Sequence, residues 1–134
     1  GNSIDHLDVD ISEYHWNPDF LELESYVAVR ETLYTHLFMS LCPITGQPDF
    51  ATIMIQYSGN SISHEGLLRY LISYREHAEF AEQITERIFI DIMNQCSPER
   101  LAVSARFNRR GGIDINTHRI HEENLPAEVR VWRQ

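Results

Sequence analysis

The sequence predicts a single α+β domain in which an antiparallel four-stranded sheet carries two helices on one face. Its 134 residues, 43% of them hydrophobic, suit one globular domain with its own core. Hydrophobic residues alternate with a period of two in residues 50–57 and 101–107, and they recur at helical spacing in residues 63–76 and 79–96. The resulting order, strand–strand–helix–helix–strand–strand (ββααββ), predicts antiparallel neighbours joined by short turns.

The first two predicted strands flank a loop that contains a cysteine. The pattern of Val27–Met39 is ambiguous between strand and helix, and its threonines and tyrosine favour a strand. Residues 40–49 contain two prolines and a glycine and must form a loop. Phe50–Tyr57 alternates cleanly, so we expect a second strand that ends in a turn at Ser58–Asn60.

Two helices and a second hairpin follow. Ser63 is a suitable N-cap for a first helix that runs to about Glu76, and the second helix begins at Glu79 and stops at Ser97-Pro98. After a strand over residues 101–107, the Gly-containing turn at residues 108–112 predicts a hairpin. Two helices on one face leave the other face uncovered, so oligomerisation or a partner domain is expected.

The ends of the chain differ from its middle in composition. Residues 1–29 carry seven acids and no basic residue, which predicts a solvated acidic lead-in or linker over residues 1–26. The folded module is expected over residues 27–120, followed by a polar tail over residues 121–134. The start, Gly1-Asn2-Ser3, lacks an initiator Met and indicates processing, an expression scar or truncation, so a fragment is expected.

Composition excludes several classes of function. The net charge of −9 argues against direct nucleic-acid binding, and no apolar run is long enough to cross a membrane. All 11 basic residues are Arg, so the chain has neither a Walker A lysine nor a Schiff-base lysine. The two cysteines, Cys42 and Cys96, suit neither a disulfide scaffold nor a four-ligand zinc site. A reducing, cytoplasmic setting without a bound metal is therefore expected.

Three groups of residues are candidates for chemistry. Cys42 lies in the Pro/Gly-rich loop and is either a nucleophile or a small buried residue, whereas Cys96 lies on the apolar repeat of the second helix. Glu82 lies near the start of that helix, where a carboxylate either faces solvent or accepts hydrogen bonds from a guanine-like edge. Arg109 and Arg110 form a local cationic spot suited to phosphate or carboxylate groups.

Four motifs together resemble the carboxy-terminal half of the two-module 7-cyano-7-deazaguanine reductases (QueF). They occur in the family's order between about Val27 and Asn116. The motifs are Leu41–Asp49 (LCPITGQPD), Glu65–Leu71 (EGLLRYL), Glu86–Phe89 (ERIF) and Arg109–Asn116 (RRGGIDIN).

The resemblance implies a tunnelling fold (T-fold) and an NADPH-dependent reduction of the nitrile of 7-cyano-7-deazaguanine to a primary amine, a step of queuosine biosynthesis for tRNA modification. Cys42 matches the family's nucleophile, which forms a thioimide, and Asp49 matches its proton-transfer acid. Glu82 matches the glutamate that binds the deazaguanine base. Arg109 and Arg110 are assigned to the cofactor phosphates.

The chain departs from the family in two respects. Ala81 stands where the family has a catalytic His, which predicts impaired activity, and His77 is considered as its substitute. The family's lysine-bearing NADPH motif lies in the other module, so a homo-oligomer or pairing with a missing amino-terminal module is expected. Two alternatives stay open: a non-catalytic T-fold assembly or ligand-binding module, and a zinc-dependent enzyme resembling GTP cyclohydrolase.

Overall fold

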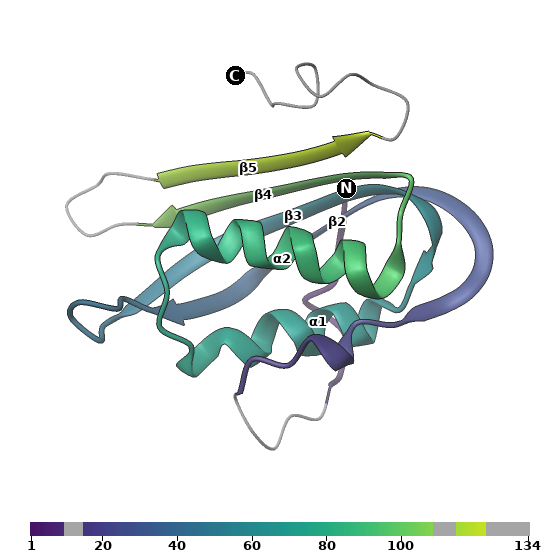
Figure 1. Cartoon of the computed structure of the whole chain (residues 1–134). Coiled ribbons are helices and arrows are strands. Elements are labelled where there is room, and N and C mark those ends of the chain that lie inside the picture. Colours follow the sequence, from purple (N-terminus) through teal and green to yellow (C-terminus); the bar gives the residue numbers. More distant parts are fainter. Residues whose placement is uncertain (10–14, 109–114, 123–134) are drawn as a thin grey trace.

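Two helices cover one face of a twisted sheet in the computed structural model, which describes residues 1–9, 15–108 and 115–122 (Figure 1). The mixed α+β class is as predicted. In chain order the elements are β1 (Asn2–Ser3), the 3-10 turn η1 (Pro18–Phe20), β2 (Leu23–Leu41), β3 (Pro48–Ile62), α1 (His64–Ile72), the 3-10 turn η2 (Ser73–Glu76), α2 (Ala81–Cys96), β4 (Arg100–Asn108) and β5 (Ile115–Glu122).

The sheet has five strands in the order β1-β2-β3-β4-β5, so the predicted count of four was wrong. The four long strands pair antiparallel as predicted, and the two-residue β1 adds to β2 in parallel beside Leu33 and Tyr34. The backbone N–H of Ile4 donates to the Tyr34 carbonyl at 3.0 Å, and the Ile4 side chain is buried. A strand of two residues shows no alternation, so the sequence pattern could not reveal it.

The turn predicted at Ser58–Asn60 was also wrong, because β3 continues through it to Ile62. These residues stay paired with Ala28–Arg30 of β2. Gly59 is required by a close approach, since a Cβ there would lie 3.0 Å from the Cα of Pro98. The small polar triplet therefore allows a neighbouring loop to approach the strand. β5 likewise extends to Glu122, two residues into the stretch predicted as tail.

The helices begin and end close to their predicted limits. Ser63 caps α1 as predicted, with its hydroxyl accepting a hydrogen bond from the Gly66 N–H at 3.1 Å. The last turn of the predicted helix is the 3-10 turn η2 instead of α-helix. α2 begins at Ala81, two residues later than predicted, and ends at Cys96. Ser97, the residue that caps it, adopts a left-handed conformation with φ of 47°.

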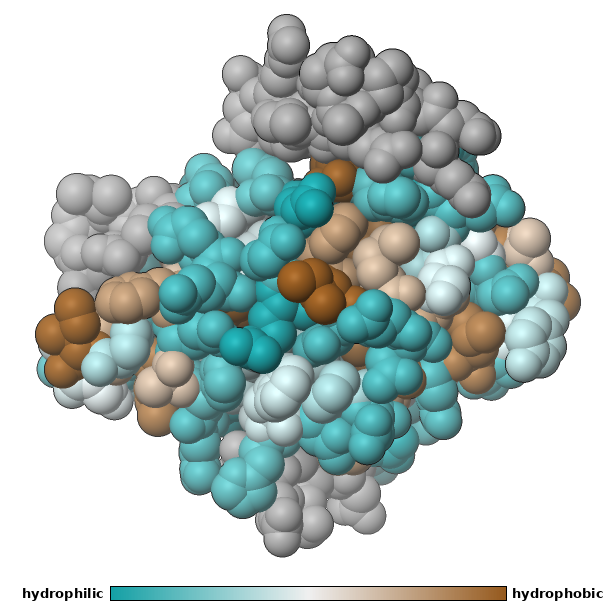
Figure 2. All heavy atoms as spheres, in the orientation of Figure 1, coloured by the Kyte–Doolittle hydropathy of each residue, from teal (hydrophilic) through white to brown (hydrophobic). Residues whose placement is uncertain are grey.

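Alternate residues of β3 and β4 fill the core beneath the helices, whereas no helix among the described residues covers the other face of the sheet. Ile53, Ile55, Val103 and Ala105 are buried, and their intervening neighbours point away from the helices. Seen from the helix side, the surface is largely hydrophilic with scattered hydrophobic residues (Figure 2). Within the described residues, no helix is long and apolar enough to cross a membrane.

The acidic amino-terminal segment contributes to the core. The side chains of Ile4 and Leu21 are 2% and 3% exposed and belong to the main hydrophobic cluster. Asp5 accepts hydrogen bonds from the Thr35 hydroxyl and, at 3.0 Å, from the His36 backbone N–H. The division into a lead-in, a module over residues 27–120 and a tail stays a prediction, but part of the first segment is packed against β2.

Candidate active site

The β2–β3 hairpin loop presents Cys42 directly after the last residue of β2. The Cys42 N–H donates to the Gln47 carbonyl and the Gly46 N–H donates to the Cys42 carbonyl, both at 2.8 Å, so the loop is closed across its base. Gly46 has a φ of +73°, a conformation that favours glycine. The Pro/Gly pattern therefore gives a tight loop that holds its cysteine in one place.

The loop also favours the thiolate of Cys42. The hydroxyl and backbone N–H of Thr45 and the backbone N–H of Ile44 donate hydrogen bonds to the sulfur and lower the pKa of Cys42, while Asp49 opposes them weakly. The side chain is partly exposed, so an electrophile can reach it. A partly exposed thiol with a lowered pKa is the environment of a reactive cysteine. Thr45 lies in the loop motif Leu41–Asp49, but no local pattern marked it as a donor to the thiol.

Asp49 lies on the other arm of the same hairpin. It is the second residue of β3 and pairs with Ser40, which is two residues before Cys42 in β2. Its charge acts on Cys42, raising the thiol's pKa slightly. The hairpin therefore brings together the two residues to which the resemblance assigns the nucleophile and the acid, although seven positions separate them in the sequence.

Glu82 lies in the first turn of α2, at the same end of the molecule as the hairpin loop (Figure 1). Its side chain is exposed. Glu86, one turn further, is paired with Arg119 at 2.9 Å, and within the described residues no hydrogen bond or ion pair engages Glu82. A carboxylate at a helix amino terminus is stabilised by the helix dipole and is free here to accept hydrogen bonds from a ligand.

A short backbone bridge ties the start of α2 to the nucleophile loop. Leu41 forms a parallel bridge with Ala78, and its N–H donates to the His77 carbonyl at 2.9 Å. The residues considered for chemistry at Cys42 and at the start of α2 are thus neighbours in the fold. His77 itself points to Glu79, with 2.7 Å between Nε2 and the carboxylate, so it belongs to an ion-pair cluster that sequence reasoning missed.

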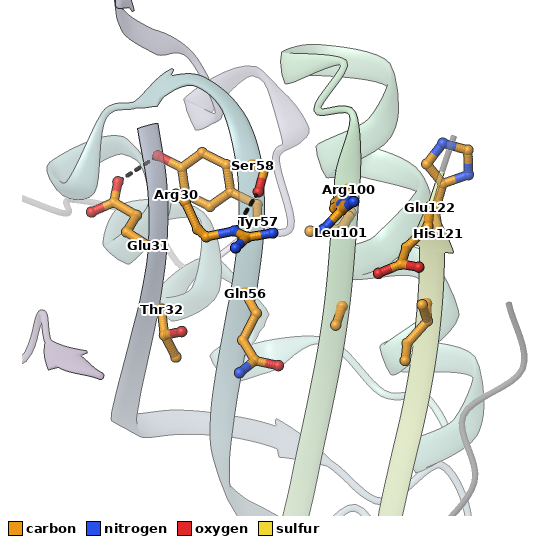
Figure 3. Close-up of a pocket in the computed structure, with 12 residues that line it drawn as sticks. Arg30, Glu31, Thr32, Gln56, Tyr57, Ser58, Arg100, Leu101, His121 and Glu122 are labelled. Atoms are coloured by element: carbon orange, nitrogen blue, oxygen red, sulfur yellow. Dashed lines mark hydrogen bonds between the residues drawn. The ribbon is translucent and has the colours of Figure 1, made fainter. Parts of the chain in front are cut away.

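The remaining predicted site residues, Arg109 and Arg110, lie outside the described residues. A separate pocket of about 230 Å³ lies on the sheet at the end remote from the hairpin loop (Figure 3). There the Arg30 Nε donates to the Ser58 hydroxyl at 3.3 Å, and Arg100 and Glu122 line the same hollow. Among the residues that the structure describes, no three His, Cys, Asp or Glu side chains are arranged to hold a metal ion.

Comparison with known proteins decides the family. The sequence profile described as QueF-like protein matches residues 48–125, more than half of the chain. The chain belongs to the QueF-like family. Reductases named NADPH-dependent 7-cyano-7-deazaguanine reductase are 49% identical in Hydrogenovibrio crunogenus and 52% identical in Buchnera aphidicola subsp. Schizaphis graminum. Both matches cover 100% of this chain but only 48% and 52% of those proteins.

A solved structure supports the fold of this QueF-like chain. The apo form of an archaeosine synthase QueF-Like superposes with a TM-score of 0.62 over 74% of this chain and 96% of that one, at 18% identity. At that identity the likeness concerns the fold alone. The chain spans about half the length of the reductases that it matches, and their activity belongs to the longer proteins.

Proposed function

We propose that this chain is the carboxy-terminal, nucleophile-bearing half of a reductase that converts the nitrile of 7-cyano-7-deazaguanine into a primary amine. The observation that carries the proposal is Cys42, a partly exposed thiol whose pKa is lowered by Thr45 within a closed hairpin loop. Its free thiol fits a reducing, cytoplasmic setting. The names of the relatives, which are about twice as long as this chain, give the substrate and the reaction.

Capture of the nitrile would require the thiolate and one proton. The Cys42 sulfur adds to the nitrile carbon, forming a C–S bond while one π bond of the C≡N group becomes a lone pair on nitrogen. That nitrogen takes a proton, which Asp49 would supply from the neighbouring strand, and the product is a neutral thioimide. Covalent capture fixes the substrate and makes the carbon more open to reduction than the free nitrile.

Glu82 would orient the base. The ring N–H and exocyclic amino group of a deazaguanine donate two parallel hydrogen bonds, which one carboxylate can accept. Glu82 is exposed in the first turn of α2 and has no partner among the described residues, so its oxygens are available. With the base held there, the nitrile would be directed towards the hairpin loop.

Reduction of the thioimide to the amine needs two hydrides, which NADPH supplies in the reductases that carry its name. The described residues around Cys42 do not fit the cofactor's phosphates, because neither the loop 42–50 nor residues 80–83 contain a basic side chain. Arg109, Arg110 and the missing half of the protein are proposed to hold it.

Ala81 favours a second candidate function, which is ligand binding without turnover. It occupies the first position of α2 beside Glu82, and its methyl group cannot transfer a proton. Where a positioned acid or base is lost, rates typically fall by about 10²–10⁴. The retained Cys42, Asp49 and Glu82 support capture in either case.

The T-fold and its assembly are part of the proposal. One face of the sheet is open, and β5 offers an edge without a further strand among the described residues. A second copy of the chain or the missing amino-terminal half would cover these surfaces.

The test is intact-protein mass spectrometry after incubation with 7-cyano-7-deazaguanine in the absence of NADPH. We expect an adduct with the full mass of the nitrile, because addition releases no leaving group. Peptide mapping should place it on Cys42, and the Cys42→Ser variant should form none. Folded protein that forms no adduct, or an adduct on Cys96, would overturn the proposal.

A further inference from the structure

We infer that Glu79, which pairs with Arg87 and His77, is a positioning residue that fixes the start of α2 against the loop that contains Cys42. The inference rests on the proposed function of Cys42 and extends it to residues that the family resemblance does not assign. Glu79, Arg87 and His77 are called the clamp below.

The backbone connection between the two parts of the site is short. The Leu41 N–H donates to the His77 carbonyl at 2.9 Å, and the Glu79 N–H donates to the Leu41 carbonyl at 3.2 Å. Leu41 directly precedes Cys42, and Glu79 precedes the first residue of α2 by two positions. The distance between the Cys42 sulfur and the Glu82 carboxylate is therefore set through residues 77–81.

The side chain of Glu79 holds this segment from the other side. Its two carboxylate oxygens accept hydrogen bonds from Nε and Nη2 of Arg87, both at 2.9 Å, and Nε2 of His77 lies 2.7 Å from one of them. The Glu79 side chain is 14% exposed. Arg87 and His77 keep the pKa of Glu79 below its usual value, with Arg87 the larger cause. Bidentate pairing fixes orientation as well as distance.

The clamp is packed against the interior. The Arg87 guanidinium lies over the Trp16 ring, 4.8 Å from its centroid, and the Trp16 indole N–H donates to Asp91 at 3.0 Å. Asp91 also accepts a hydrogen bond from the buried Tyr70 hydroxyl at 2.5 Å. Arg87 is thus held in place by groups of the core, and through it the loop before α2 is held as well.

The start of α2 depends on this support because it has no cap of its own. Phe80 occupies the N-cap position and makes no side-chain hydrogen bond to the helix. Helices commonly define their first turn through a Ser, Thr, Asp or Asn at that position. Here the bridge to Leu41 and the Glu79 clamp take over that function, and they direct the first turn, with Glu82, towards Cys42.

The chain contains a matched control for the clamp. Arg119 pairs with Glu86 of the same helix, also with 2.9 Å between Nε and the carboxylate, and it lies over the Phe89 ring at 4.5 Å. Like Arg87, it therefore joins an acidic group to an aromatic ring. Arg119 comes from β5, however, and neither of these two contacts involves the bridge at Leu41.

The experiment compares Glu79→Gln and Arg87→Met with Arg119→Met on the full chain. At saturating 7-cyano-7-deazaguanine, we expect both clamp variants to form the Cys42 adduct about 10²-fold more slowly, because misplacement by about 1 Å costs a factor of this size. The half-saturating concentration should change much less. Arg87→Lys should restore part of the rate. Alkylation of Cys42 by iodoacetamide should keep its pH profile, because Thr45 lies within the loop.

Amide hydrogen exchange provides a readout that does not need the substrate. In the clamp variants, exchange at the Leu41 and Glu79 amides should be at least about tenfold faster than in Arg119→Met, because the bridge opens more often. Exchange and capture that both match Arg119→Met would overturn the inference, and so would accelerated exchange with unchanged capture. If the unsubstituted chain captures nothing, the proposed function fails, and exchange alone then decides whether Glu79 positions the segment. Should Glu79→Gln not fold, Arg87→Met provides the same comparison, with Arg87→Lys as its partial rescue.

Discussion

The two ends of α2 each lie beside a cysteine, and they place that side chain in different surroundings. At the start of the helix, Cys42 is partly exposed, and hydrogen bonds from Thr45 and Ile44 lower its pKa. In the last turn, Cys96 is 4% exposed, and burial raises its pKa to about 11. The comparison shows that thiolate chemistry depends on the donors that a loop supplies, since the residue type is the same at both ends.

The backbone differs between the two ends as well. The carboxyl end closes locally, with the Ser97 N–H donating to the Met93 carbonyl at 3.1 Å. The amino end lacks a side-chain cap and is held by Leu41 and by the pairing of Glu79 with Arg87. The carboxyl end is therefore defined by neighbours in sequence, whereas the amino end is also held by a distant part of the chain, the last residue of β2 before Cys42.

The largest expected effect would come from restoring an acid–base group at the start of α2. Ala81→His should raise the rate of nitrile reduction by about 10²–10⁴, because a positioned imidazole can transfer protons to the reacting nitrogen. The measurement is steady-state NADPH oxidation with the amino-terminal half of a relative supplied. Gln83→His, which adds the same ring two residues along, serves as the control. Equal rates for the two variants would argue that the reaction does not need an acid–base group at position 81.

The contrast between the cysteines predicts selective alkylation. At pH 7 iodoacetamide should modify Cys42 at least about 10²-fold faster than Cys96, because the thiolate is the reactive form and Cys96 has a pKa of about 11. Thr45→Val removes one donor, so the pH profile of Cys42 should move to higher pH and its rate at pH 7 should fall about 3-fold to 10-fold. Peptide mapping of the labelled protein measures both rates. Similar alkylation rates at the two cysteines, or an unchanged pH profile of Cys42 in Thr45→Val, would contradict the proposed difference between the two thiols.

The smallest effect is expected at the carboxyl end. Ser97 adopts a φ of 47°, a conformation in which a side chain is unfavourable and glycine is not. Ser97→Gly should therefore raise the free energy of unfolding by about 0.5–1 kcal/mol, after the loss of the weak hydroxyl contact to Met93. Denaturant unfolding measures this change, and the rate of capture at Cys42 should stay the same. A loss of stability would show that the hydroxyl contact outweighs the backbone strain.

The sequence predicts the elements whose pattern is local. The alternation of β3 and β4 and the spacing in α1 and α2 report burial on one side, which is why their existence and order agree with the structure. The failures have tertiary causes. Ser58–Asn60 stays in β3 because β2 pairs with it, and the two-residue β1 forms because Ile4 is buried against the sheet.

Some residues of the candidate site could likewise be predicted from the sequence, and others could not. Cys42 was open to two interpretations from the residues alone, and the resemblance supplied its role together with those of Asp49 and Glu82. Neither the residue patterns nor the resemblance predicted the clamp. Glu79 precedes α2 and pairs with Arg87 eight residues later, outside the spacing at which charged pairs within a helix are recognised. No local pattern connects Trp16 with either residue.

The contact between Arg87 and Trp16 allows the conformation of this region to be followed by tryptophan fluorescence. Indole emission responds to the charge and the water around the ring, and Trp16 is in contact with the guanidinium and hydrogen-bonded to Asp91. The chain has two tryptophans, so replacing Trp132 with phenylalanine would leave Trp16 as its single tryptophan. Opening and closing at the start of α2 could then be followed in real time, without a label and without touching the reacting thiol.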